Sequence, residues 1–281
     1  MDRPLGPCGG TAEHLAELVR TLQDEIIPRL VSARRPVQAA TAEQPSPEAL
    51  VGADEVAELA GLALVPDERP SRAYIESLVD RGVSAETMYL QLLAPAARHL
   101  GELWESDACD FTQVTVGLWR LQQIAHELGP LLQRDPAPAF AQGHRILLSP
   151  APGEQHTLGI FMVSEFFLQA GWDVWGAPIA TTEELLRLVR EQWFDVVGLS
   201  SGCRSRVGRL ASTIAEIRKA SRNRRIGVMV GGPIFLGDPS LVGAVGADAT
   251  AGNGRDAPAE AEVLLSRLGP APTDHSEDAA C

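Results

Sequence analysis

The pattern of apolar residues changes character near the middle of this 281-residue chain. Between residues 52 and 134, apolar residues recur every three or four positions over long stretches, which is typical of amphipathic helices. From residue 145 onward, short runs rich in Val, Ile and Leu alternate with helical stretches, which is typical of parallel strands joined by helical crossovers. The chain is therefore expected to form a helical region followed by an α/β region.

In the helical region, short breaks between long helices indicate antiparallel neighbours and hence a four-helix bundle. Pro95 falls inside the third helix and is expected to kink it. The helices are expected over residues 52–63, 69–82, 84–106 and 110–134.

The second region has five strand-like runs, which predict a flavodoxin-like (Rossmann-type) five-stranded parallel sheet domain. In such a sheet, ligands bind outside the carboxyl ends of the strands. The strands are expected over residues 145–150, 173–178, 195–201, 226–232 and 247–251, and the helices over 157–170, 181–192, 206–220, 239–244 and 256–268.

These elements predict four segments along the chain. Residues 11–32 carry an apolar helical stripe, and the Pro- and Ala-rich stretch after it is typical of a linker. The polar C-terminal end is expected to be disordered. The expected division is 1–50 for the N-terminal helix and linker, 51–135 for the helical bundle, 143–268 for the α/β domain and 269–281 for the tail.

Composition narrows the class of protein. The formal net charge of −13 argues against direct binding to nucleic-acid phosphates as the main function, because such binding depends on Lys and Arg. The four cysteines show no metal-binding or paired spacing. No apolar run is long enough to span a bilayer, and no signal-peptide core opens the chain. We therefore expect a cytoplasmic protein with reduced thiols.

Three loops stand out because each follows an expected strand: Gly153–Gly159 after the first, Ser200–Gly202 after the third and Gly231–Gly232 after the fourth. In a doubly wound sheet these loops meet at one edge, near the point where the strand order reverses. In the first loop, His156 can offer one ring nitrogen to a metal while its other nitrogen bonds to Glu154. The loops therefore predict a metal or cofactor site.

The glycines of these loops have separate expected roles. Gly159 is expected to let the following helix pack closely on the sheet. Gly231 and Gly232 are expected to leave room where a bulky ligand presses against the backbone.

Together the loops resemble the cobalamin-binding signature, in which Asp-x-His-x-x-Gly is followed downstream by Ser-x-Leu and then Gly-Gly. The positions that match are His156, Gly159, Ser200 or Ser201, Gly231 and Gly232. Two positions depart, since Glu154 stands for the usual Asp and Gly202 or Cys203 for the Leu. The resemblance implies cobalamin as the cofactor and His156 as the protein ligand to cobalt.

The helical region adds a second resemblance. Leu100–Trp104 and Phe111–Thr115 are similar to the helical cap of methionine-synthase-like cobalamin modules, which covers the upper face of the corrin ring. In light-sensing members a Glu-His pair stands where this chain has Val114 and Thr115, so the upper His ligand is not matched. The further cofactor-binding residues expected on this basis are Trp104, Phe111, Val114 and Thr115, and Thr250 is assigned to the same set.

A narrower resemblance covers nearly the full length. Asp24–Leu30, Val114–Leu121 and Gly231–Phe235 are together similar to the PpaA/AerR family of corrinoid-binding antirepressors. The resemblance implies a transcriptional regulator and not an enzyme. It also implies a response to ligand, redox state or light, with a PAS-domain repressor of photosynthesis genes, of the PpsR/CrtJ type, as the partner through which the protein reaches DNA.

Two alternatives stay open. One is a corrinoid methyl-carrier or mutase subunit, in which cobalt performs the chemistry. The other is a haem-based redox sensor, since a related domain in the same regulatory circuit is described as haem-binding. The regulator is favoured over the carrier because carriers usually keep Asp where this chain has Glu154, and because of the extra N-terminal helix and linker.

A basic stretch runs from Arg204 to Arg225 and holds the only lysine of the chain, Lys219, with Glu216 as its single acidic residue. Such a stretch is often only the solvated face of a helix and the turn after it. It is alternatively a docking surface for an acidic partner or for DNA held by that partner.

Overall fold

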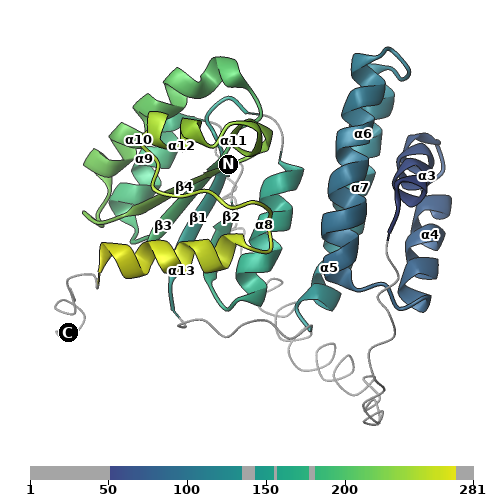
Figure 1. The fold of residues 1–281 in the computed structure, drawn as a ribbon, viewed down its shortest axis with the longest axis horizontal. Coiled ribbons are helices and arrows are strands. Elements are labelled where there is room, and N and C mark those ends of the chain that lie inside the picture. Colours follow the sequence, from purple (N-terminus) through teal and green to yellow (C-terminus); the bar gives the residue numbers. More distant parts are fainter. Residues whose placement is uncertain (1–50, 135–142, 155–156, 177–180, 270–281) are drawn as a thin grey trace, which may run out of the picture. The chain divides into compact units, whose positions relative to one another are not determined.

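The computed structural model describes residues 51–134, 143–154, 157–176 and 181–269, all within one compact unit of residues 48–281 (Figure 1). Two predicted segments lie outside the described residues, namely the expected N-terminal helix and linker and nearly all of the expected C-terminal tail.

The helical region contains the expected helices with small shifts at their ends. Three are α3 (Ala53–Leu64), α4 (Arg69–Asp80) and α7 (Phe111–Leu132). The remaining one is a continuous run of three segments, namely α5 (Ala85–Thr87), the π-helical η2 (Met88–Leu93) and α6 (Ala94–Glu105).

Pro95 was expected to kink this run, and a π-helical segment lies directly before it. Proline lacks a backbone N–H and its ring collides with the carbonyl four residues earlier. Directly before Pro95, the Ala94 N–H donates to the Tyr89 carbonyl five residues back, so the turn is widened into a π-helix. The predicted disturbance is therefore a π-helical turn.

Side-chain hydrogen bonds satisfy backbone groups at the start of α7 and at the end of α3. At the start of α7, Asp110 accepts from the Gln113 N–H at 2.8 Å and Gln113 accepts from the Asp110 N–H at 2.9 Å, which is a capping box. At the end of α3, the buried Arg120 guanidinium donates to the carbonyls of Ala63 (2.8 Å), Pro66 (2.6 Å) and Val65. These carbonyls lack partners within α3, so Arg120 fastens α7 to the end of that helix.

One apolar core holds the helices together and continues into the α/β region. Tyr89 lies in its centre, and its hydroxyl donates to the Ala125 carbonyl at 2.5 Å. Its ring meets Phe166 of α8 (Leu158–Gln169) edge-on, with the centroids 5.9 Å apart. The helical region therefore packs on α8 through shared core residues.

The sheet has four parallel strands in the order β2-β1-β3-β4, which confirms the predicted fold class (Figure 1). The strands are β1 (Arg145–Pro150), β2 (Asp173–Gly176), β3 (Val196–Ser200) and β4 (Gly227–Gly231).

The fifth predicted strand, over residues 247–251, is wrong as a strand. Ala249 forms only an isolated parallel bridge with Met229. The Asp248 side chain, and not a backbone carbonyl, accepts the Val228 N–H at 2.7 Å, which interrupts the regular ladder.

Helices cover both faces of the sheet, as predicted (Figure 1). One face packs on α8 and α13 (Ala257–Leu268), and the other on α9 (Thr182–Glu191) and α10 (Val207–Ala220). Short segments complete the region, namely η3 (Arg204–Arg206), α11 (Pro233–Gly237) and α12 (Ser240–Ala244).

Candidate functional site

The carboxyl edge of the sheet brings the three predicted loops side by side. Pro150, Ser200 and Gly231 are register partners at the ends of β1, β3 and β4. The backbone pairing continues for one more step, since the Ala151 N–H donates to Ser200 (2.8 Å) and the Ser201 N–H donates to Gly231 (3.0 Å). The loops that follow therefore begin at the same level, beside one another.

Glu154 joins the first loop to the second. One carboxylate oxygen accepts the Gly202 N–H at 2.9 Å, and the other lies 3.5 Å from the Arg206 guanidinium. The Glu154 side chain is only 3% exposed, whereas the Arg206 side chain is 37% exposed, so the carboxylate is buried while its cationic partner reaches solvent. The carboxylate is therefore held in a fixed position at the edge of the sheet. His156, the predicted metal ligand, lies outside the described residues.

Two hydroxyl groups at this edge are buried without a hydrogen-bond partner among the described residues. They are the Oγ of Ser201 and the Oγ1 of Thr250. Leaving a buried hydroxyl unpaired costs roughly 1–3 kcal/mol, so each favours a ligand that can complete its bonding. Ser200, one residue earlier, is partly exposed at the end of β3.

The glycines at the edge differ in what they accommodate. Gly232 has φ +106°, and a Cβ there would lie 2.3 Å from the Ser201 carbonyl oxygen, so the backbone itself requires glycine. At Gly231 a Cβ would meet no atom within 4 Å. Gly159 is exposed and equally open, so the expectation that it allows close packing of α8 on the sheet is wrong.

The predicted residues of the helical region divide into two groups. Trp104 and Phe111 are 50% and 72% exposed at the junction of α6 and α7, and Thr115 is exposed one turn after Phe111. Val114 is instead buried in the helical core. Its side chain packs within the bundle and is not part of the exposed surface.

Part of the basic stretch of residues 204–225 pairs with acidic side chains of the protein itself. Arg204 pairs with Asp238 at 2.7 Å. Arg218 pairs with Asp248 at 2.8 Å and also donates to the carbonyls of Ile226 and Gly246. Arg206 pairs with Glu154, so these contacts engage three of the basic side chains of the stretch.

Sequence reasoning missed two residues at this edge. Arg206 belonged to the basic stretch, and its spacing of a few residues past β3 was the signal that it could reach the first loop. Cys203 is exposed, and its hydrogen bond with Ser205, at 2.9 Å, lowers the pKa of the thiol. It occupies one of the two positions where the signature has Leu.

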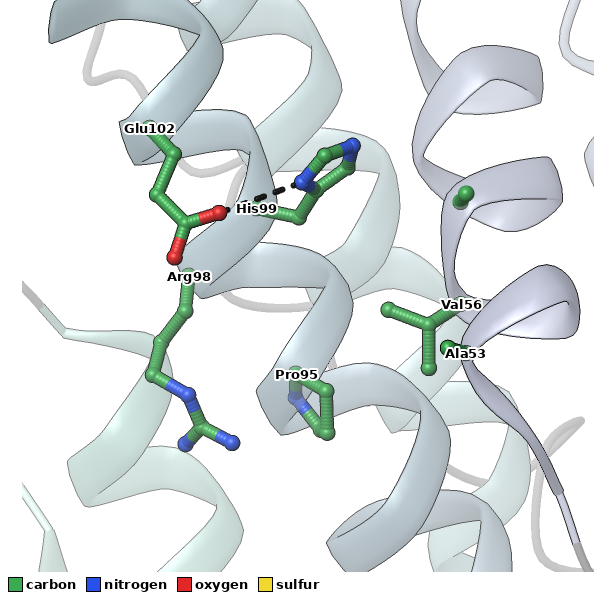
Figure 2. A pocket seen from close by; sticks show the side chains of 7 residues that line it. Ala53, Val56, Pro95, Arg98, His99 and Glu102 are labelled. Carbon is green, nitrogen blue, oxygen red and sulfur yellow. Dashed lines mark hydrogen bonds and ion pairs between the residues drawn. The ribbon is translucent and has the colours of Figure 1, made fainter.

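A cavity of about 360 Å³ lies elsewhere, between α3 and α6 (Figure 2). Pro95 and Val56 line it, and His99 lies 3.3 Å from Glu102 at its border. None of the predicted site residues lines this cavity. Within the described ranges, no cluster of three or more His, Cys, Asp or Glu side chains could hold a metal, and no helix is long and apolar enough to cross a membrane.

Comparison with known proteins points to the α/β region, which contains the three loops at the carboxyl edge of the sheet. Residues 144–262 match the family model of the B12 binding domain, a range that includes all three loops. Among solved structures, the Methanosarcina barkeri monomethylamine corrinoid protein has the same fold, with a TM-score of 0.63. It is 15% identical, and the match covers 75% of this chain and 99% of that protein.

A curated relative covers more than the α/β region. It is an uncharacterized 20.5 kDa protein in the bchF-crtJ intergenic region of Rhodobacter capsulatus, 32% identical over 169 residues. The match spans 59% of this chain and 85% of the relative. The chain therefore carries a B12 binding domain and belongs to the same family as this bchF-crtJ intergenic-region protein, in agreement with the PpaA/AerR-like motifs.

Proposed function

We propose that the chain is a cobalamin-binding transcriptional regulator whose cofactor lies at the carboxyl edge of the sheet. The observation that carries this proposal is the coincidence of the B12-binding match with the edge where the three loops converge. Haem, the other cofactor considered from the sequence, has no support from the family match or from the fold neighbour.

The residues at the edge fit such a cofactor. The unpaired hydroxyls of Ser201 and Thr250 could bond to the polar nucleotide part of cobalamin, and the open space at Gly231 leaves its backbone accessible. His156 would bind the cobalt, and Glu154 would orient its imidazole. When bound, cobalamin supplies a redox-active cobalt whose axial ligands can exchange.

Glu154 is suited to orienting that ligand because the protein already fixes it. Its bonds to Gly202 and Arg206 restrain the carboxylate from the side of the second loop. A fixed carboxylate sets the tautomer and the ring orientation of a metal-ligating histidine. In the helical region, Trp104, Phe111 and Thr115 are exposed and available to contact the cofactor, whereas Val114 would act only through core packing.

We assign the protein to regulation, and not to methyl transfer, on two grounds. The Rhodobacter relative is named for its place between bchF and crtJ, and the PpaA/AerR-like motifs extend beyond the cofactor domain. The proposed partner is a PAS-domain repressor of the PpsR/CrtJ type, through which the protein would act on photosynthesis genes. Cofactor occupancy or light would provide the signal.

The first test of cofactor binding uses the purified full chain mixed with hydroxocobalamin or haemin and separated by gel filtration. Cobalamin should co-elute with the protein, and haemin should not. Co-elution of haemin alone would contradict the assignment of the cofactor.

The regulatory proposal is tested by a mobility shift with a photosynthesis-gene promoter at about 150 mM salt, where surface charges are screened beyond roughly 8 Å. The cobalamin-loaded protein alone should give no specific shift and should alter the shift made by the repressor. Specific binding by the protein alone would overturn the indirect route to DNA. A loaded protein that transfers methyl groups to an acceptor, and leaves the repressor's shift unchanged, would instead be a carrier.

A further inference from the structure

An exposed stripe on α7 is not explained by the packing of the helical core. Phe111, Thr115 and Trp119 follow one another at four-residue spacing, and all three are exposed. Trp119 is 52% exposed although it is among the largest side chains of the chain. A large indole left this open on a helix is often a contact surface for something else.

This stripe lies on the same side of α7 as the contact with α8. At about 100° per residue, Trp119 and His126 differ by only about 20° around the helix. The His126 ring lies against Phe161 of α8, with centroids 4.0 Å apart. Trp119 therefore faces the side on which α8 lies, but nearer the start of α7.

The contacts between α7 and α8 give their relative direction. Further along both helices than the contact of His126 with Phe161, the Gln133 side chain donates to the Glu165 carbonyl at 3.0 Å. The contacts advance along both helices together, so the two helices run parallel. Since α8 begins just after the loop that follows β1, the start of α7 extends past the carboxyl edge of the sheet.

Helix geometry sets the height of each aromatic above that edge. At 1.5 Å per residue, Trp119 lies about 10 Å before His126, whereas α8 begins only about 4–5 Å before Phe161. Trp119 is thus about 6 Å beyond the start of α8, at the level of the loop that contains Glu154. Phe111 lies roughly 12 Å further away along the same helix.

We propose that Trp119 forms a side wall of the corrinoid site and contacts the edge of the corrin ring. This inference rests on the proposed function, since the occupant is the cobalamin at the carboxyl edge. A corrin offers an apolar ring with amide groups around it. An indole matches both, because its face packs on the ring and its N–H can donate to an amide carbonyl.

The test is an absorbance titration of the full chain with hydroxocobalamin, in wild type and in Trp119→Ala, Trp119→Phe and Val79→Ala variants. Trp119→Ala should weaken binding roughly tenfold while keeping the spectrum of the bound wild type, because the cobalt ligand is untouched. Trp119→Phe should restore part of the affinity. Val79→Ala, which trims an exposed side chain on α4, should bind as the wild type does.

Circular dichroism and gel filtration of each variant separate the outcomes. If Trp119→Ala is folded and binds hydroxocobalamin with unchanged affinity, the inference is wrong. A changed oligomeric state with unchanged affinity would show that the stripe joins copies of the chain instead. If the wild type itself does not bind hydroxocobalamin, the proposed function fails before this inference is reached.

Discussion

The buried carboxylate of Glu154 accepts the backbone N–H of Gly202 at 2.9 Å and so joins the loop after β1 to the loop after β3. The longer side chain at this position, where the cobalamin signature has Asp, reaches across the edge of the sheet. Arg206 lies 3.5 Å from its second oxygen and opposes its charge. The departure from the signature is therefore built into the local structure.

Replacing Glu154 by Ala should weaken cobalamin binding by about 10–100-fold, the usual cost of losing a group that orients a metal ligand. Glu154→Gln keeps an oxygen that can accept from the Gly202 N–H but loses the ion pair with Arg206. The affinity of this variant for cobalamin should therefore lie between those of the wild type and Glu154→Ala. Absorbance titrations with hydroxocobalamin measure both changes. Equal affinity in the wild type and Glu154→Ala would show that the carboxylate has no role in binding.

Gly231 and Gly232 are neighbours that should respond differently to the same substitution. Gly232→Ala forces a side chain into a left-handed backbone and onto the Ser201 carbonyl, and should lower the free energy of unfolding by more than about 2 kcal/mol. Gly231→Ala meets open space, so its unfolding free energy should change by less than about 0.5 kcal/mol while cobalamin binding weakens. Urea denaturation compares the stabilities. Equal stability of the two variants would contradict this account of Gly232.

Arg120 should contribute to stability and not directly to the cofactor site. Arg120→Met leaves the carbonyls at the end of α3 without their buried donor and should destabilise the protein by about 3 kcal/mol. Arg187→Met, at an exposed position on α9, is the control and should change stability by less than about 0.5 kcal/mol. Thermal unfolding that is the same for both variants would refute the capping role.

The two tyrosines predict a loss of stability at high pH. Burial, followed by the Glu58 carboxylate, raises the pKa of Tyr74 from 10.0 to about 12, and burial also raises the pKa of Tyr89. The folded state therefore holds these protons more tightly than the unfolded state does. Their contribution to stability is complete below pH 10 and is lost as the pH rises through about 12.

When the folded chain is titrated with base, the phenolate absorbance should therefore not rise around pH 10.0, the ordinary pKa of tyrosine. The unfolding free energy of the wild type should fall over this alkaline range, and Tyr74→Phe should flatten the fall. A phenolate signal that appears at pH 10.0 in the folded protein would contradict the raised pKa values.

Much of the architecture could be predicted because apolar periodicity follows burial directly. The helices of the first region and four of the five strands lie where the pattern placed them. The fifth strand failed because a short run such as residues 247–251 does not reveal that the Asp248 side chain will take a backbone N–H of β4. Likewise, Pro95 predicted a disturbed helix but not that the disturbance would be a π-helical turn.

The candidate site was predictable at the level of loops and less so at the level of contacts. Topology alone brings the loops after β1, β3 and β4 to one edge. The pairing of Glu154 with Arg206 depends on side chains 52 residues apart, which spacing does not disclose. The exposure of Trp119 was also hidden, because an aromatic in a helical run is more often part of the core.

The most direct test of the account is the absorbance spectrum of hydroxocobalamin bound to the full chain and to its His156→Ala variant, with His99→Ala as a control outside the proposed site. The wild type and His99→Ala should bind cobalamin and shift its spectrum to that of a histidine-ligated corrinoid. His156→Ala should lose that spectrum and bind at least about tenfold more weakly. An unchanged affinity and spectrum in folded His156→Ala would contradict the assignment of the cobalt ligand and, with it, the proposed cofactor site.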